Sequence, residues 1–165
     1  MYNYHLLLIL SVLFLFSGCT KEPPEFSNLN PVTITVTNNG IPVEGVHVSL
    51  SSKTPQSLRA CSGVTNTQGV ANIQTAIREH IGNGVEAGTY TVVLVKTVAF
   101  PPELDVVLPP GDLSPKSKEI LDKQEKFLKQ QRIIPEPLES NVTSPIELIV
   151  TQNESAVLTV DLSKY

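Results

Sequence analysis

Cysteine and histidine are the residue types most able to do chemistry in this sequence, and they are few. There are two cysteines, Cys19 and Cys61, and three histidines, His5, His47 and His80. No histidine lies in a His-x-x-Glu or His-Glu-x-x-His arrangement, the spacings that would indicate zinc ligands. We therefore expect no metal site, no cofactor and no catalytic residue, which leaves Cys19 as the residue with the most informative surroundings.

Cys19 follows an apolar run and two small residues. The run extends from Leu6 to Phe16 with a single serine inside it, and Ser17 and Gly18 separate it from the cysteine. It is much shorter than the roughly 20 residues that a membrane-spanning helix needs. Such a length is typical of the core of a signal peptide, which is removed on export. We predict a signal peptide over residues 1–18, cleaved between Gly18 and Cys19.

The stretch Leu15-Phe16-Ser17-Gly18-Cys19 resembles the lipobox of bacterial lipoproteins. The resemblance implies a diacylglyceryl thioether (a palmitate-type lipid) on Cys19 and usually an N-acyl chain, and several acyl chains hold a protein stably on a membrane. It implies an exported protein that is lipid-anchored on the cell membrane or the outer membrane. Phe16 in place of the usual leucine, and a start without Lys or Arg, keep two alternatives open: an ordinary signal peptide and an uncleaved interfacial segment. With Cys19 acylated, Cys61 is a lone thiol, which we expect to be a small, partly buried apolar residue.

Composition and charge narrow the class of protein. The net charge of −4 lacks the basic footprint of a nucleic-acid-binding protein, so no nucleic acid partner is expected. Aromatic residues make up only 5% of the chain and tryptophan is absent, which favours short strands over a helical bundle. Residues 19–31 contain three prolines and no apolar periodicity, so they are predicted to form an extended tether.

Alternating apolar residues predict seven strands between residue 32 and the C-terminus. Val32, Ile34 and Val36 alternate with threonines, the pattern of a strand with one buried face. The run Tyr90 to Lys96 is apolar on both faces, so we expect it to be a central strand. Gly82 to Ala87 fits the pattern G-x-G-x-x-A but precedes a strand, so a loop is expected there. The other candidate strands are 46–50, 58–65 (the weakest), 70–75, 146–150 and 158–162.

Three stretches of this region resemble motifs of carboxypeptidase regulatory-like domains. Asn39 to Val48 is similar to the family's hairpin G-x-P-[VL]-x-G-[AV]-x-V, Gly63 to Ala71 to its turn T-[ND]-x-x-G, and Ala87 to Val92 to its strand G-x-Y-x-[VL]. They occur in the family's order. The resemblance implies a mainly β fold over residues 32–165, a seven-stranded Greek-key, transthyretin-like β-sandwich. In carboxypeptidases this domain accompanies the enzyme and is not itself catalytic.

Residues 101–137 interrupt the strand pattern. Ser114-Pro115 is a cap residue followed by proline at the first helical position, and the pattern stays helical up to Gln131. A narrow apolar stripe on this helix consists of Ile120, Leu121, Phe127 and Leu128. We therefore expect a Pro-rich excursion between two strands, with one helix that lies on the surface of the sandwich.

The predicted helix concentrates positive charge. Six of the 12 basic residues lie between Lys116 and Arg132, against three acidic ones. The pairs Glu119–Lys123, Asp122–Lys126 and Glu125–Lys129 are spaced i,i+4, as on a solvated, charge-paired helix face. The alternative is that Lys123, Lys126 and Lys129 contact anionic lipid or a cell-wall polymer.

These features predict a non-enzymatic module at the cell envelope. Its expected role is structural or one of protein interaction, with the lipid membrane as partner through acylated Cys19 and an envelope protein as a further partner. The alternative is a glycan- or cell-wall-binding module, although the aromatic residues that could serve as sugar platforms are few: Tyr90, Phe100, Phe127 and Tyr165. An enzyme would need a catalytic site that these residues do not assemble.

Overall fold

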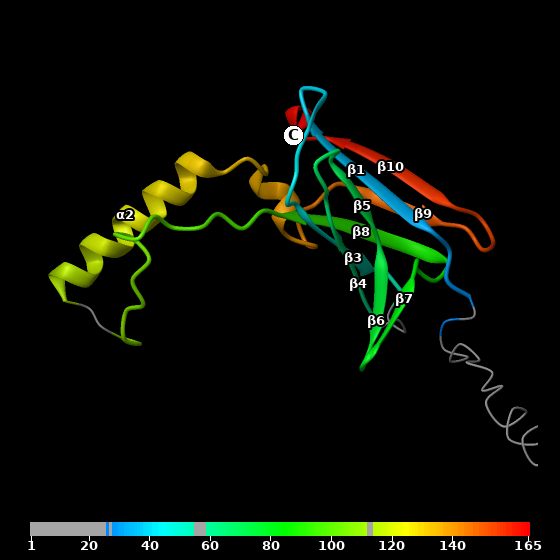
Figure 1. Ribbon diagram of the computed structural model, residues 1–165, viewed down its shortest axis with the longest axis horizontal. Coiled ribbons are helices and arrows are strands. Elements are labelled where there is room, and N and C mark those ends of the chain that lie inside the picture. The colour runs from blue at the N-terminus through cyan, green and yellow to red at the C-terminus, as the bar shows by residue number, and fades with distance from the viewer. Residues whose placement is uncertain (1–25, 27, 55–58, 112–113) are drawn as a thin grey trace, which may run out of the picture.

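The computed structural model describes Phe26 and residues 28–54, 59–111 and 114–165. Within these ranges the protein is mainly β, with two sheets and one α-helix (Figure 1). The expectation of a mainly β fold with a single helix outside the sheets is confirmed for the described residues.

The smaller sheet is built around β1 (Val32–Asn38). On one side β1 pairs in parallel with β10 (Ala156–Asp161). On its other side it pairs antiparallel with β2 (Ile41–Pro42) and with β5 (Val70–Asn72). The alternation predicted for β1 is confirmed, because its valines and isoleucine are buried and the threonines between them are half-buried. The strands nearest the two ends of the domain are therefore neighbours.

The larger sheet has six strands in the order β7-β6-β4-β3-β8-β9, and every neighbouring pair is antiparallel. In sequence order these strands are β3 (His47–Ser52), β4 (Ala60–Val64), β6 (Gln74–Ile77), β7 (His80–Asn83), β8 (Gly88–Val95) and β9 (Glu147–Val150). Both sheets contribute inward-facing side chains to a single hydrophobic cluster, from Ile34 and Val36 of β1 to Val48, Val92 and Leu94 of the larger sheet.

β8 is buried on both faces, as predicted. Tyr90, Val92 and Leu94 point into the shared core, while Thr91 and Val93 on the outer face are also largely covered. The cover comes from the chain after the helix, where the 3-10 turn η3 (Glu136–Glu139) packs against β8. Leu138 of η3 is fully buried and belongs to the hydrophobic cluster that both sheets share, whereas Val93 lies beside residues 139–141, which follow it.

One glycine of the predicted turns is required by a close approach of the backbone. Gly69 has φ +72°, and a Cβ there would lie 2.5 Å from the carbonyl oxygen of Val36. Its amide oxygen also accepts a hydrogen bond from the Val36 N–H at 2.8 Å. A side chain at position 69 would therefore force β1 away from the turn that leads into β5.

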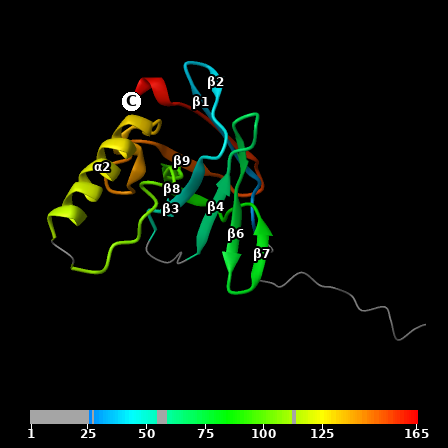
Figure 2. The same cartoon turned by 60° about the vertical axis from the view of Figure 1, so that its left-hand side comes forward.

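The helix α2 (Pro115–Gln131) has the predicted bounds. The Ser114 hydroxyl accepts a hydrogen bond from the Ser117 N–H, and Pro115 occupies the first turn, as the sequence indicated. The expected position is wrong, however. Instead of lying on a sheet, α2 projects beside the β domain, and only Ser117 of the helix is buried (Figures 1 and 2).

Two further features differ from the sequence-based expectations. The described part of the chain contains ten strands instead of seven, because β2 was not predicted, the run 70–75 divides into β5 and β6, and the expected loop at Gly82 forms part of β7. The packed part of the chain also begins before Val32. Phe26 and Asn30 are both buried, at 7% and 3% exposure.

Candidate functional site

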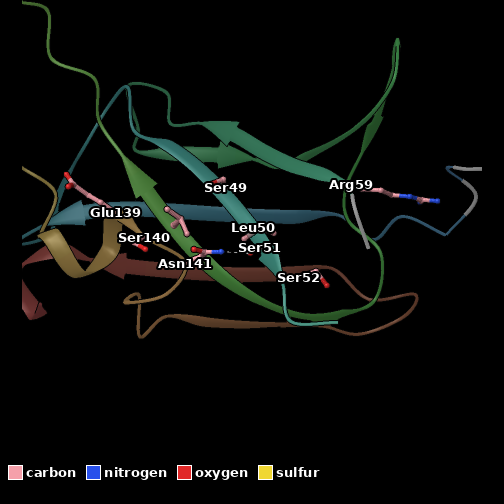
Figure 3. A pocket seen from close by; sticks show the side chains of 9 residues that line it. Ser49, Leu50, Ser51, Ser52, Arg59, Glu139, Ser140 and Asn141 are labelled. Atoms are coloured by element: carbon pink, nitrogen blue, oxygen red, sulfur yellow. Dashed lines mark hydrogen bonds between the residues drawn. The ribbon is translucent and has the colours of Figure 1, made fainter. Parts of the chain in front are cut away.

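A polar cleft lies on the outer face of the larger sheet, between β3 and the turn after η3 (Figure 3). It has a volume of about 490 Å³. Ser49 and Ser51 of β3 line one side, because residues 48 and 50 of the same strand point into the core, and Ser52 at the end of the strand adds to the lining. Glu139, Ser140 and Asn141 line the other side, Val93 of β8 contributes to the lining, and Arg59 lies at the far end in Figure 3.

The charged groups of the cleft are paired. Arg59 forms a salt bridge with Glu86, and Glu139 accepts from Arg132 at 3.2 Å. The Asn141 amide donates to the Ser51 hydroxyl at 3.3 Å across the cleft. The hydroxyl and amide groups can both donate and accept, so this arrangement is suited to a neutral polar ligand held by hydrogen bonds.

Cys61 and Tyr90 lie in the core beneath the sheet. Cys61 is 4% exposed, and its Sγ lies 3.4 Å from the Thr75 hydroxyl. Burial raises the pKa of the Cys61 thiol, so the thiol stays protonated at neutral pH. The Tyr90 hydroxyl donates to the Glu86 carbonyl at 2.9 Å, and burial raises the Tyr90 pKa to about 12. Both side chains are therefore neutral packing residues, as expected for Cys61.

The two histidines of the β domain are exposed. His47 begins β3 and lies on its outward face, and His80 begins β7. Among the residues that the structure describes, no group of three His, Cys, Asp or Glu side chains could hold a metal ion.

The structure places the three candidate lysines on exposed positions of α2. Lys123 pairs with Glu119 at 2.7 Å, and Lys129 pairs with Glu125 at 2.6 Å. The hydrogen bond from each lysine lowers the pKa of its glutamate. Two of the three predicted i,i+4 pairs are thus confirmed, whereas Lys126 forms no salt bridge within the described part of α2.

Gly18 and Cys19 lie outside the described residues, as does the whole predicted signal peptide 1–18. Their predicted roles rest on the sequence alone. In the part of the chain that the structure describes, no helix is both long and apolar enough to cross a membrane.

The sequence analysis did not find the polar cleft. Part of it could be seen in the sequence, because Ser49 occupies the polar phase of the predicted strand 46–50. The other side comes from residues 139–141, about 90 positions later, and depends on how η3 folds back over β8.

We compared the chain with known proteins by sequence and by structure. No family model, no curated protein and no solved structure matches it.

Proposed function

We propose that the chain is a membrane-anchored bacterial lipoprotein whose β domain has a non-enzymatic structural or protein-interaction role at the cell envelope. The observation that carries this proposal is Ser17-Gly18-Cys19 directly after an apolar run of signal-peptide length. Acylation of Cys19 would place the β domain close to the bilayer, since Phe26, only seven residues further along the chain, is buried against the domain.

We further propose that the two sheets form a seven-stranded Greek-key sandwich of the transthyretin-like type, extended by short additional strands. The single core that both sheets share supports this proposal. So do the three motif stretches: Asn39 to Val48 contains β2 and leads into β3, Gly63 to Ala71 contains the turn before β5, and Ala87 to Val92 opens β8.

The test of the anchor is a comparison of Cys19→Ala with Cys61→Ala in the bacterial cells that produce the protein. We expect the wild type and Cys61→Ala to take up labelled palmitate and to sediment with membranes, whereas Cys19→Ala does neither. The proposal is wrong if wild type takes up no label and Cys19→Ala still sediments with membranes. If the anchor is confirmed, crosslinking of the anchored protein in intact cells would identify an envelope partner.

The polar cleft favours a second candidate function, the binding of a glycan or cell-wall fragment. Its hydroxyl and amide groups offer the hydrogen bonds that sugar hydroxyls need, although none of the described residues that line it is aromatic. A glycan array that includes cell-wall fragments tests this candidate. Binding that is lost in Asn141→Ala and kept in Thr159→Val, a change on exposed β10, would support it, and absence of binding across the array would reject it.

A further inference from the structure

β10 is the longest of the described strands that have an open edge. From Ala156 to Asp161 it pairs in parallel with β1, and it pairs with no other described strand. Figure 1 shows it at the margin of the smaller sheet, beyond β1. An open edge presents backbone N–H and C=O groups to which a further strand can bind.

The hydrogen bonds to β1 identify the residues whose backbone faces the open edge. The Ala156 N–H donates to the Pro31 carbonyl at 2.9 Å, so Ala156 and, two residues later, Leu158 direct their backbone groups toward β1. Val157 and Thr159 have the opposite phase and direct their N–H and C=O groups away from the sheet. Apart from the ladder with β1, no described residue forms a hydrogen bond with the backbone of Val157 or Thr159.

β10 lacks the features that protect edge strands against pairing, which are charge, proline and short length. The other open edges have at least one of them. β2 consists of two residues and contains Pro42, β9 carries Glu147 in a salt bridge with Lys53, and β5 and β7 have three and four residues. Residues 156–160 contain neither a charge nor a proline, and Val157 is 72% exposed. Among the described edges, β10 is therefore the one best suited to receive a strand.

We propose that two copies of the chain pair through β10, antiparallel and about a two-fold axis at Leu158. In this register Val157 lies opposite Thr159 of the second copy, and the reverse pair is formed by symmetry. Each pair exchanges two hydrogen bonds, because both residues direct their backbone groups outward. The smaller sheet then continues from one copy into the other.

A second copy fits this edge because β10 is complementary to itself. Leu158 lies opposite Leu158 of the second copy on the core side, and the outer face pairs uncharged Val157 with Thr159. Asp161, the charged residue of the strand, lies opposite Ser155, so like charges do not meet. The contact is isologous and closed, because each copy uses its open β10 edge and leaves none for a third copy. The proposal supplies a partner for the proposed interaction role, but it uses no residue of the predicted anchor.

A lysine on the outer face of β10 tests the contact. In the proposed register the two copies of residue 157 are diagonal neighbours on one face, so Val157→Lys brings two like charges together. The full-length chain is purified in detergent, and its mass is measured against concentration by analytical ultracentrifugation. We expect a dimer in the wild type and a dissociation constant about tenfold higher in Val157→Lys. Ile41→Lys, a change at a 69% exposed position on β2, is the matched control and should dimerise as the wild type does.

Charge complementation identifies the contact as β10 with β10. A mixture of Val157→Lys and Val157→Glu should form mixed dimers as stable as those of the wild type, because opposite charges then meet across the joint. Deuterium exchange of the amides in residues 156–160 should slow as the wild type dimerises. A wild type that stays monomeric, equal weakening by Val157→Lys and Ile41→Lys, or a mixture that does not recover overturns the proposal. Slow exchange in a monomer also overturns it, because another segment would then cover the edge.

The dimer and the anchor are tested separately. Cys19→Ala should form the same dimer, since the contact lies wholly within the β domain. Dimers without acylation would reject the proposed anchor and keep the contact, whereas an acylated monomer would reject the contact and keep the anchor.

Discussion

Thr65 shows how one buried hydroxyl joins two turns of the β domain. It is 3% exposed, its Oγ1 accepts from the Val46 N–H at 2.8 Å, and it donates to the Val43 carbonyl at 2.7 Å. Its backbone adds hydrogen bonds to Gly45 and Val46. The side chain therefore satisfies backbone groups of the connection between β2 and β3, which no ladder of either sheet reaches.

Replacing Thr65 with valine should destabilise the protein. The change keeps the shape of the side chain but leaves the Val46 N–H and the Val43 carbonyl without this partner, and buried unsatisfied groups cost about 1–3 kcal/mol each. We expect a loss of about 2–3 kcal/mol in the free energy of unfolding, measured by urea denaturation. Thr159→Val, on the exposed face of β10, should change it by less than about 0.5 kcal/mol; equal effects of the two changes would refute the role of the Thr65 hydroxyl.

Tyr90 should make stability fall at high pH. Burial raises its pKa to about 12 from an ordinary value of 10, so the unfolded chain loses the phenolic proton at a lower pH than the folded chain does. The contribution of neutral Tyr90 is complete below pH 10 and is lost as the pH rises to about 12. Tyr90→Phe removes this titration, so its free energy of unfolding should decline less than that of wild type over the same interval. Parallel declines in the two proteins would contradict the assignment.

At the scale of elements, short sequence patterns correctly predicted those strands and helix ends whose structure depends on near neighbours in the sequence. The alternation from Val32 to Val36 placed β1, and Ser114-Pro115 placed the start of α2, because strand faces and helix caps depend on near neighbours in sequence. The hairpin of β6 and β7 was missed for a tertiary reason. A Cβ at Gly82 would collide with the side chains of Phe26 and Leu29, so that glycine belongs to a strand against which the N-terminal segment packs.

The same limit explains the misplaced helix. An apolar stripe predicts that a helix packs against another apolar surface, but it does not identify that surface. The outer face of β8, which could have received α2, is occupied by η3 and the chain after it. The ring of Phe127 packs instead against Phe100, directly before the Pro-rich excursion.

Because of this packing we expect the arm formed by residues 97–111 and α2 to unfold independently of the β domain. Phe127→Ala removes its main ring contact, so the amides of α2 should exchange with deuterium faster while the thermal midpoint of the β domain changes little. Leu94→Ala, in the shared core, should instead cost about 2–5 kcal/mol and lower that midpoint. Hydrogen exchange by mass spectrometry and calorimetry measure the two effects, and a large loss of midpoint in Phe127→Ala would show that the arm supports the sheets.

At the scale of the whole molecule, contacts between segments far apart in sequence determine which strands pair and where the cleft forms. The pattern within a single element does not predict these contacts. The polar cleft joins residues 49–52 to residues 139–141, and β1 pairs with β10 across most of the chain. The alternation of apolar residues within one strand does not indicate which distant segment that strand will contact. The composition nevertheless indicated the mainly β class, because strand propensity averaged over the chain does not depend on which residues are in contact.

Asn30 holds three of these distant segments together. Its backbone pairs with Val85 in both directions, its amide donates to the Val85 carbonyl at 3.2 Å, and its Oδ1 accepts from the Asn153 N–H at 2.6 Å. It thereby joins the N-terminal segment to the entry of β8 and to the turn between β9 and β10. A membrane anchor at Cys19 would transmit a pull to the β domain through the packing of Phe26 and through the hydrogen bonds of Asn30.

Asn30→Ala should therefore loosen the N-terminal segment as well as the fold. The Asn153 N–H loses its partner in a turn where Asn153 has φ +64°, and we expect a loss of about 1–3 kcal/mol in unfolding free energy. Asn28→Ala is the matched control, because residue 28 is exposed and contributes only its backbone oxygen to Asn30. Limited proteolysis should cut the Asn30 variant before β1 faster than the control. If both variants resist equally, the packing of Phe26 alone fixes the N-terminal segment, and the domain would bear tension from an anchor through that ring.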